Sequence, residues 1–299
     1  MARFFQYLFD GLSGGSIYAL LALGLVVIYR GTGHLNFAQG EMAMLCTFIV
    51  WELQNRGVPL ILATLVGMLV GFAMGAVTEV ALIRPVARRS QGAVFVVSIA
   101  LFLGINSLAS LIWGRPPQEA MPSLFPNKPT DFARIFGAVW RYESVGILIV
   151  TLVLNALLFA LFQKTRFGLA MRAVASNAES ARLAGISTGT VLMASWGLAA
   201  ALGSLAGTLF AGHNGSVTPA LMFSVFVYAS AAATLGGFDS PGGAVIAGLG
   251  IGVIENMAAG YSPGWVGQDM RIAVALLVIF VVLLFKPSGL FGSVRVERV

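Results

Sequence analysis

Long apolar runs separated by short polar segments make up most of the chain. About 20 consecutive apolar residues cross a bilayer as a helix, and most of the runs approach that length. The runs are Leu12–Tyr29, Met42–Trp51, Val58–Thr78, Ala93–Trp113, Ser144–Phe162, Thr188–Ala211, a second helix between Pro219 and Gly236, Ala244–Asn256 and Arg271–Phe285. The pattern predicts an all-α polytopic membrane protein, a single bundle over residues 1–299 with about 8 to 10 transmembrane segments.

The shortest apolar run has too few residues to cross a bilayer. Met42–Trp51 has ten residues, and it follows a polar stretch that contains Asn36, Gln39 and Glu41. Irregular backbone is not stable in hydrocarbon, so this segment is expected to be a broken or re-entrant helix that faces protein or a water-filled cavity. Asn36, Gln39 and Glu41 are therefore candidates for lining a solute path. The alternative is that they cap the broken helix near its positive end.

Two further polar residues lie beside an apolar run near the C-terminus, Glu255 and Asn256. An ionisable group at membrane depth is costly and is a candidate for function. We add both to the candidate pathway. A simple hydrogen bond at a helix end remains the alternative.

The longest basic interruption, 163–186, is predicted to face the cytoplasm because Lys164, Arg166, Arg172 and Arg182 outweigh Glu179. Within it, 173–184 is alanine-rich and is expected to form a short helix that ends at Gly185 in a left-handed cap. If the spans alternate, the proline-containing segment 114–143 lies on the outer side.

Composition supports the membrane assignment and limits the chemistry. Hydrophobic residues make up 58% of the 299 residues and charged residues only 10%, against roughly a quarter in soluble proteins. The net charge of +6 fits an anionic inner leaflet and membrane lipid better than nucleic acid. A single cysteine, Cys46, excludes an internal disulfide. No signal-peptide pattern opens the chain, so the first helix is expected to be retained.

Catalytic and metal-binding motifs are not found in the sequence. None of the three lysines follows a glycine, so the GxxxxGK phosphate loop is missing and the chain is not expected to hydrolyse ATP. His34 and His213 lie far apart in sequence, and neither has a third potential ligand nearby, so no metal site is expected. No cofactor is predicted in this chain, and the protein is not expected to be an enzyme.

Four segments together resemble a known family. The stretch Asn177, Ala178, Glu179, Ser180, Ala181, Arg182, Leu183, Ala184, Gly185 and Ile186 resembles the ATPase-docking helix of ABC importer permeases. The segments 28–42 (IYRGTGHLNFAQGEM), 235–243 (LGGFDSPGG) and 286–292 (KPSGLFG) resemble branched-chain amino acid (LivH-type) permeases in the same order. Ser180 stands where many such permeases have alanine.

This resemblance implies an ABC uptake system in a bacterial inner membrane, with the C-terminus of this chain in the cytoplasm. It implies a second homologous permease subunit, two cytoplasmic ATP-binding subunits that carry ATP and Mg, and a periplasmic solute-binding protein. This chain would form half of the translocation pathway for branched-chain or related amino acids and would couple to the ATPases through 173–186. An ion-coupled secondary transporter that uses Glu41 or Glu255 is the alternative, although such a carrier needs no ATPase-docking helix.

Overall fold

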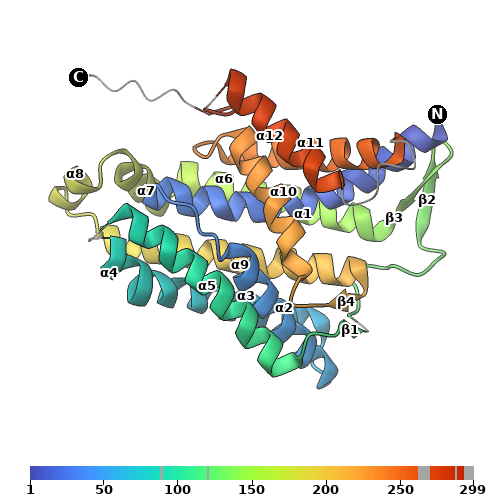
Figure 1. Ribbon diagram of the computed structural model, residues 1–299, viewed down its shortest axis with the longest axis horizontal. Coiled ribbons are helices and arrows are strands. Elements are labelled where there is room, and N and C mark those ends of the chain that lie inside the picture. The colour runs from blue at the N-terminus through green and yellow to red at the C-terminus, as the bar shows by residue number, and fades with distance from the viewer. Residues whose placement is uncertain (88–89, 120, 262–269, 287, 293–299) are drawn as a thin grey trace.

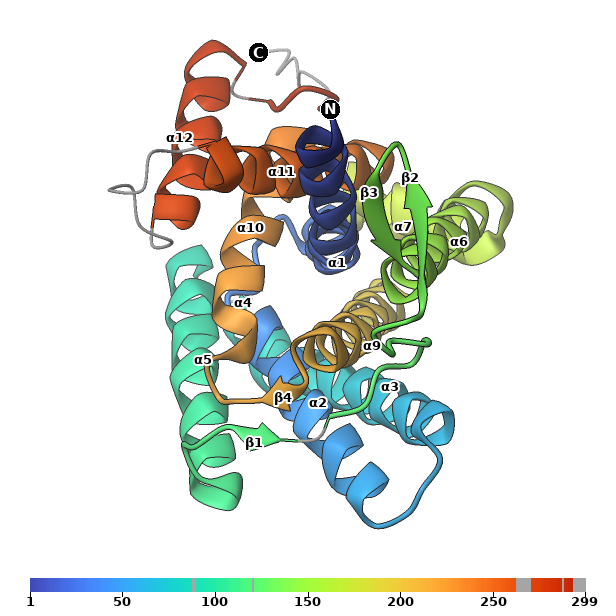
Figure 2. The same cartoon turned by 90° about the vertical axis from the view of Figure 1, so that its right-hand side faces the viewer.

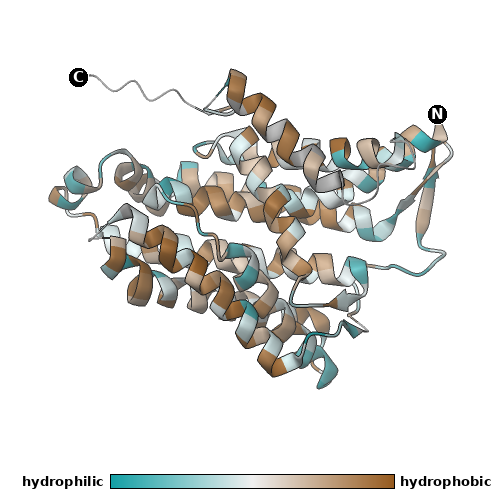
Figure 3. Ribbon diagram, viewed as in Figure 1, coloured by the Kyte–Doolittle hydropathy of each residue, from teal (hydrophilic) through white to brown (hydrophobic). Residues whose placement is uncertain are grey.

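The computed structural model describes residues 1–87, 90–119, 121–261, 270–286 and 288–292. Within these ranges, six helical stretches are long and apolar enough to cross a membrane. They are α1 (Ala2–Thr32), α3 (Leu60–Thr78) continued by the π-helical turn η1 (Glu79–Ile83) and α4 (Arg84–Ala87), α5 (Gln91–Trp113), α6 (Tyr142–Lys164), α9 (Thr188–Asn214) and α11 (Pro241–Tyr261). Three shorter helices complete the bundle: α2 (Gln39–Asn55), α10 (Leu221–Gly236) and α12 (Met270–Phe285). These nine stretches correspond to the nine predicted apolar runs, and Figure 3 shows that apolar residues predominate in them.

Helix α1 lies at the centre of the bundle (Figure 2), and small residues let its neighbours approach closely. A Cβ atom on Gly252 of α11 would lie 2.3 Å from the carbonyl oxygen of Gly11 on α1. The seam between α3 and α9 is similar, because a Cβ on Gly75 would lie 2.3 Å from the Trp196 carbonyl oxygen. Lipid gives helices little hydrophobic reason to associate, so close backbone packing of this kind holds them together. The glycine-rich runs of the sequence therefore mark helix contacts.

Helices α2 and α10 both begin deep inside the bundle. The Gln39 side-chain nitrogen donates to the carbonyl oxygen of Ala199, near the middle of α9, at 2.7 Å. The first two turns of α10 pack beside it, since a Cβ on Gly40 would lie 3.3 Å from the Met222 carbonyl oxygen and 3.0 Å from the Phe226 Cβ. At 17 and 16 residues, each helix is about 25 Å long. Neither helix is as long as the spanning helices around it.

The prediction for Met42–Trp51 and the polar stretch before it was correct in one respect and wrong in another. Non-helical backbone does enter the bundle between α1 and α2, and Asn36 and Ala38 there are fully buried. However, the helix begins at Gln39 instead of Met42 and continues to Asn55. Gln39 and Glu41 can be part of a buried helix because protein groups satisfy their side chains.

The two ends of the bundle carry different structures (Figure 1). Helices α7 (Arg166–Ser176) and α8 (Ala178–Leu183) lie at one end. At the other end, the segment 114–143 contains three short strands, β1 (Gln118–Glu119), β2 (Phe132–Ile135) and β3 (Ala138–Arg141). Strands β2 and β3 form an antiparallel hairpin, and β1 pairs antiparallel with β4 (Ser216–Val217). The sequence pattern did not predict these strands.

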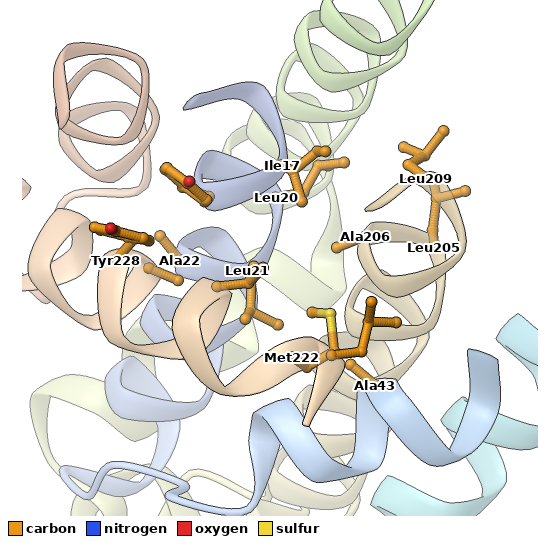
Figure 4. Close-up of a cluster of buried hydrophobic side chains, with 14 of the residues drawn as sticks. Ile17, Leu20, Leu21, Ala22, Ala43, Leu205, Ala206, Leu209, Met222 and Tyr228 are labelled. Atoms are coloured by element: carbon orange, nitrogen blue, oxygen red, sulfur yellow. The ribbon is translucent and has the colours of Figure 1, made fainter. Parts of the chain in front are cut away.

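An apolar cluster occupies the space among α1, α2, α9 and α10 (Figure 4). Its side chains converge from all four helices, with Leu21 from α1, Ala43 from α2, Leu205 from α9 and Met222 from α10. At its border the ring of Tyr18 stacks on that of Tyr228, with 4.7 Å between centroids. The centre of the bundle is therefore apolar, and the polar groups described below lie around it.

Candidate functional site

The predicted short helix at 173–184 is two helices that meet at Asn177. Asn177 has an extended backbone, and its side-chain oxygen accepts from the backbone nitrogens of Glu179 at 3.0 Å and Ser180 at 2.8 Å. This is a helix N-cap, which satisfies backbone donors that have no partner within the helix. The segment therefore contains a separate helix, α8, that starts at Ala178.

The end of α8 matches its prediction. Gly185 has φ +82°, in the left-handed region that glycine adopts without strain. The Ile186 nitrogen donates to the Ala181 oxygen and the Gly185 nitrogen to the Arg182 oxygen, each at 3.0 Å. These two bonds form a Schellman motif. Helix α8 is thus capped at both ends by its own residues.

Helix α8 projects from the bundle and presents most of its side chains to the outside. Ala181 is buried and Ile186 is partly buried, and both pack against the core cluster that includes Phe162 and Met171. In contrast, Glu179, Ser180 and Arg182 are exposed, and the Leu183 side chain is 87% exposed. Helix α8 is therefore anchored to the bundle on one face, while its other face, including Leu183, is exposed.

Of the predicted pathway residues, Asn36, Gln39 and Glu41 lie together at the start of α2. The Asn36 side chain donates to the Gln39 side-chain oxygen at 3.2 Å, and its own oxygen accepts from the Ala38 backbone nitrogen at 3.0 Å. Asn36 therefore organises the turn before α2, while no described side chain caps the first turn of the helix itself. Gln39 ties this turn to the middle of α9.

The Glu41 side chain contacts a different helix, α5, and its partner there, Asn106, was not indicated by the sequence. The Asn106 side-chain nitrogen on α5 donates both to Glu41 Oε2 and to the Pro219 carbonyl oxygen, each at 2.9 Å. Asn106 was not among the predicted residues because it lies within the apolar run 93–113, and the hydropathy pattern of that run indicates only a membrane span. A lone asparagine in such a run was the available signal, since amides in membrane helices usually bond to a neighbouring helix.

Glu255 and Asn256 make separate contacts on α11. The Tyr18 hydroxyl on α1 donates to Glu255 Oε2 at 2.8 Å, and Glu255 is 6% exposed. The Asn256 side chain donates back to the Gly252 carbonyl oxygen of its own helix at 3.0 Å. The structure therefore places Glu255 in the seam between α1 and α11, with partners different from those of Glu41.

With this geometry established, comparison with known proteins identifies the family. Residues 7–285 match the family described as the permease component of the branched-chain amino acid transport system. The chain belongs to this permease family. It is 31% identical to the high-affinity branched-chain amino acid transport system permease protein LivH of Escherichia coli K12, over 99% of this chain and 98% of that protein. It is 29% identical to BraD, the corresponding permease of Pseudomonas aeruginosa, over the same shares of the two chains.

More distant similarities are also found. The galactose/methyl galactoside import permease MglC of Escherichia coli K12 is 26% identical over 91% of this chain and 77% of that protein. Among solved structures, PsaBC from Streptococcus pneumoniae in complex with Fab aligns with a TM-score of 0.47 and 12% identity, over 93% of this chain and 91% of that chain.

An ion pair of the permease with a buried carboxylate lies beside the first turn of α9. Glu79 in η1 is 1% exposed and accepts from Arg84 Nε at 3.0 Å and Arg84 Nη2 at 2.5 Å. Arg84 Nη2 also donates to the carbonyl oxygen of Gly189, in the first turn of α9. Glu79 and Arg84 are five residues apart in the sequence and meet across the π-helical turn. The contact with Gly189 connects the α3–α4 turn to the helix that follows α8.

The two histidines lie in different surroundings in the permease. His213 Nδ1 lies 3.4 Å from the Glu143 carboxylate, and the His34 backbone nitrogen donates to the Thr32 hydroxyl. No group of three or more potential metal ligands occurs among the residues that the structure describes.

Proposed function

We propose that the chain forms half of the membrane pathway of an ABC uptake transporter that imports branched-chain or related amino acids across a bacterial inner membrane. A second, homologous permease subunit would complete the pathway. Two cytoplasmic ATP-binding subunits, which carry ATP and Mg, would dock on 173–186, and a periplasmic binding protein would deliver the solute at the opposite end of the bundle. The C-terminal residues 293–299, which we expect in the cytoplasm, lie outside the described residues.

The observation that supports this proposal best is the construction of α8. A six-residue helix is too short to be stable by itself in water. Here it is capped at both ends and anchored through Ala181, while its outer residues, including Leu183, have no covering partner within the described part of the chain. The 31% identity to a permease of a branched-chain amino acid system supports the solute class.

The polar cluster supports a pathway role for Asn36, Gln39 and Glu41. These groups lie where α2 and α10 begin inside the bundle, and non-helical backbone at membrane depth is tolerated only within protein or beside water. Together with the apolar cluster they would offer hydrogen bonds to a polar head and apolar contact to an aliphatic side chain. Glu255 and Asn256 are also proposed to contribute to the pathway, from the seam between α1 and α11.

Co-purification and uptake test the docking proposal. In Glu179→Arg and Leu183→Ser, the outer face of α8 changes while its caps remain, so we expect loss of ATPase subunits from the purified complex and loss of ATP-dependent leucine uptake. Lys128→Ala, an exposed change at the opposite end of the bundle, is the control and should retain both. Normal ATPase recovery and uptake in both α8 variants would refute docking through this helix.

A further inference from the structure

Four glutamates are buried in the described part of the chain, and they differ in their partners. Glu79 pairs with Arg84, Glu143 lies beside His213, and Glu255 accepts from the Tyr18 hydroxyl. Glu41 is 2% exposed, and its carboxylate accepts from the neutral amide of Asn106. Among the described residues, no Lys, Arg or His nitrogen lies within 4.0 Å of it. Glu41 therefore lacks the cationic partner that a buried carboxylate usually requires.

The Asn106 amide nitrogen occupies a position that an ammonium group could take. It donates at 2.9 Å to two acceptors that come from different elements, Glu41 Oε2 on α2 and the Pro219 carbonyl oxygen just before α10. Two converging oxygens, one of them on a carboxylate, are the ligands that an –NH₃⁺ group accepts as a multiple donor. A charged donor would satisfy them better than the neutral amide does.

The location also fits a solute on its way across the membrane. Glu41 lies in the first turn of α2, which begins beside the middle of α9 and next to the first turn of α10. The apolar cluster of Ala43 and Met222 starts on the same two helices (Figure 4). An amino acid bound by its ammonium group at Glu41 would thus have apolar surface within reach of its side chain.

We propose that the Glu41 carboxylate and the Pro219 carbonyl oxygen bind the ammonium group of a zwitterionic amino acid during transport. When no solute is present, the Asn106 amide donates to these two oxygens instead. The proposal rests on the transport function proposed above and names the part of the solute that this cluster recognises. Binding exchanges the Asn106 amide for the solute ammonium, with no covalent change. Because the exchange replaces one donor by another, the site would bind and release its solute readily.

Ligand-dependent thermal stabilisation of the purified complex, without its binding protein, tests the site directly. The probes are L-leucine and (S)-2-hydroxy-4-methylpentanoate, in which a hydroxyl replaces the ammonium group. Wild type should be stabilised by leucine and much less by the hydroxy acid. In Glu41→Gln the leucine affinity should fall roughly 10- to 100-fold, the value of one charge-assisted hydrogen bond. Glu52→Gln, on the same helix but paired with Arg56 at 2.7 Å on the exposed surface, should behave like wild type.

A second variant changes the response in the opposite direction. Asn106→Ala removes the competing amide and leaves both acceptors, so leucine should stabilise it at least as strongly as wild type. An unchanged leucine response in Glu41→Gln, equal responses of wild type to the two probes, or no response of wild type to leucine would each overturn the proposal. ATP-dependent leucine uptake by the wild-type complex is measured in parallel, because its absence would contradict the transport function itself.

Discussion

The close contact between α1 and α11 predicts that replacing glycine by alanine has opposite effects on stability at two positions of α11. The two positions, Gly250 and Gly252, are only two residues apart. A Cβ added at Gly252 would lie 2.3 Å from the Gly11 carbonyl oxygen and 2.4 Å from Gly15 Cα. These are backbone atoms, so no side-chain rotation can relieve the overlap, and the helices must separate. A Cβ added at Gly250, on the same helix, has no atom within 4 Å.

The magnitude follows from two opposing terms. Alanine in place of glycine favours a helix by about 1 kcal/mol at either position. At Gly252 alone, overpacking costs about 1–3 kcal/mol. The free energy of unfolding should therefore be lower in Gly252→Ala than in Gly250→Ala by about 1–3 kcal/mol, a difference of roughly 2–10 °C in unfolding midpoint.

The single cysteine provides the assay. Cys46 is buried with 0% exposure, so a thiol reagent should label this chain only after unfolding. Labelling of its gel band is followed against temperature for wild type and the two variants in the same detergent. Gly250→Ala should match or exceed the wild-type midpoint, and Gly252→Ala should fall below it. Equal midpoints for the two variants would refute the close approach of α1 and α11.

Three further predictions concern the end of the bundle that carries α7 and α8, and the membrane topology. Asn177→Ala removes the cap of α8 and should cost that helix about 1 kcal/mol, so uptake should fall while Asn177→Asp retains it; equal uptake would contradict the cap's importance. Arg84→Gln leaves a buried carboxylate unpaired and should lower the unfolding midpoint of the permease, whereas combining it with Glu79→Gln should restore most of the loss; no recovery in the double variant would contradict pairing as the cause. Single cysteines at Ser176 and Lys128, in a chain without its native cysteine, should react with an impermeant maleimide from opposite sides of the membrane, and labelling from one side would overturn the topology.

The sequence by itself determined the features that depend on neighbouring residues. The apolar runs located the helices because any segment in lipid must satisfy its backbone internally. Gly185 located the end of α8, since only a residue tolerant of positive φ ends a helix in this way. The four family segments gave the class of transporter in the same way, from local sequence.

The tertiary structure decided which distant residues meet. Glu41 and Asn106 are 65 positions apart and Tyr18 and Glu255 are 237 apart, so no local period relates them. The break at Asn177 also depends on context, because an alanine-rich segment favours a continuous helix unless Ala181 and Ile186 are held against the bundle. In a membrane the apolar pattern is nearly the same on every face of a helix. It therefore indicates how long the helix is, but not which of its faces packs against the other helices. Only the packed bundle shows that α2 and α10 begin inside it, next to the apolar cluster and beside the polar groups of the proposed pathway.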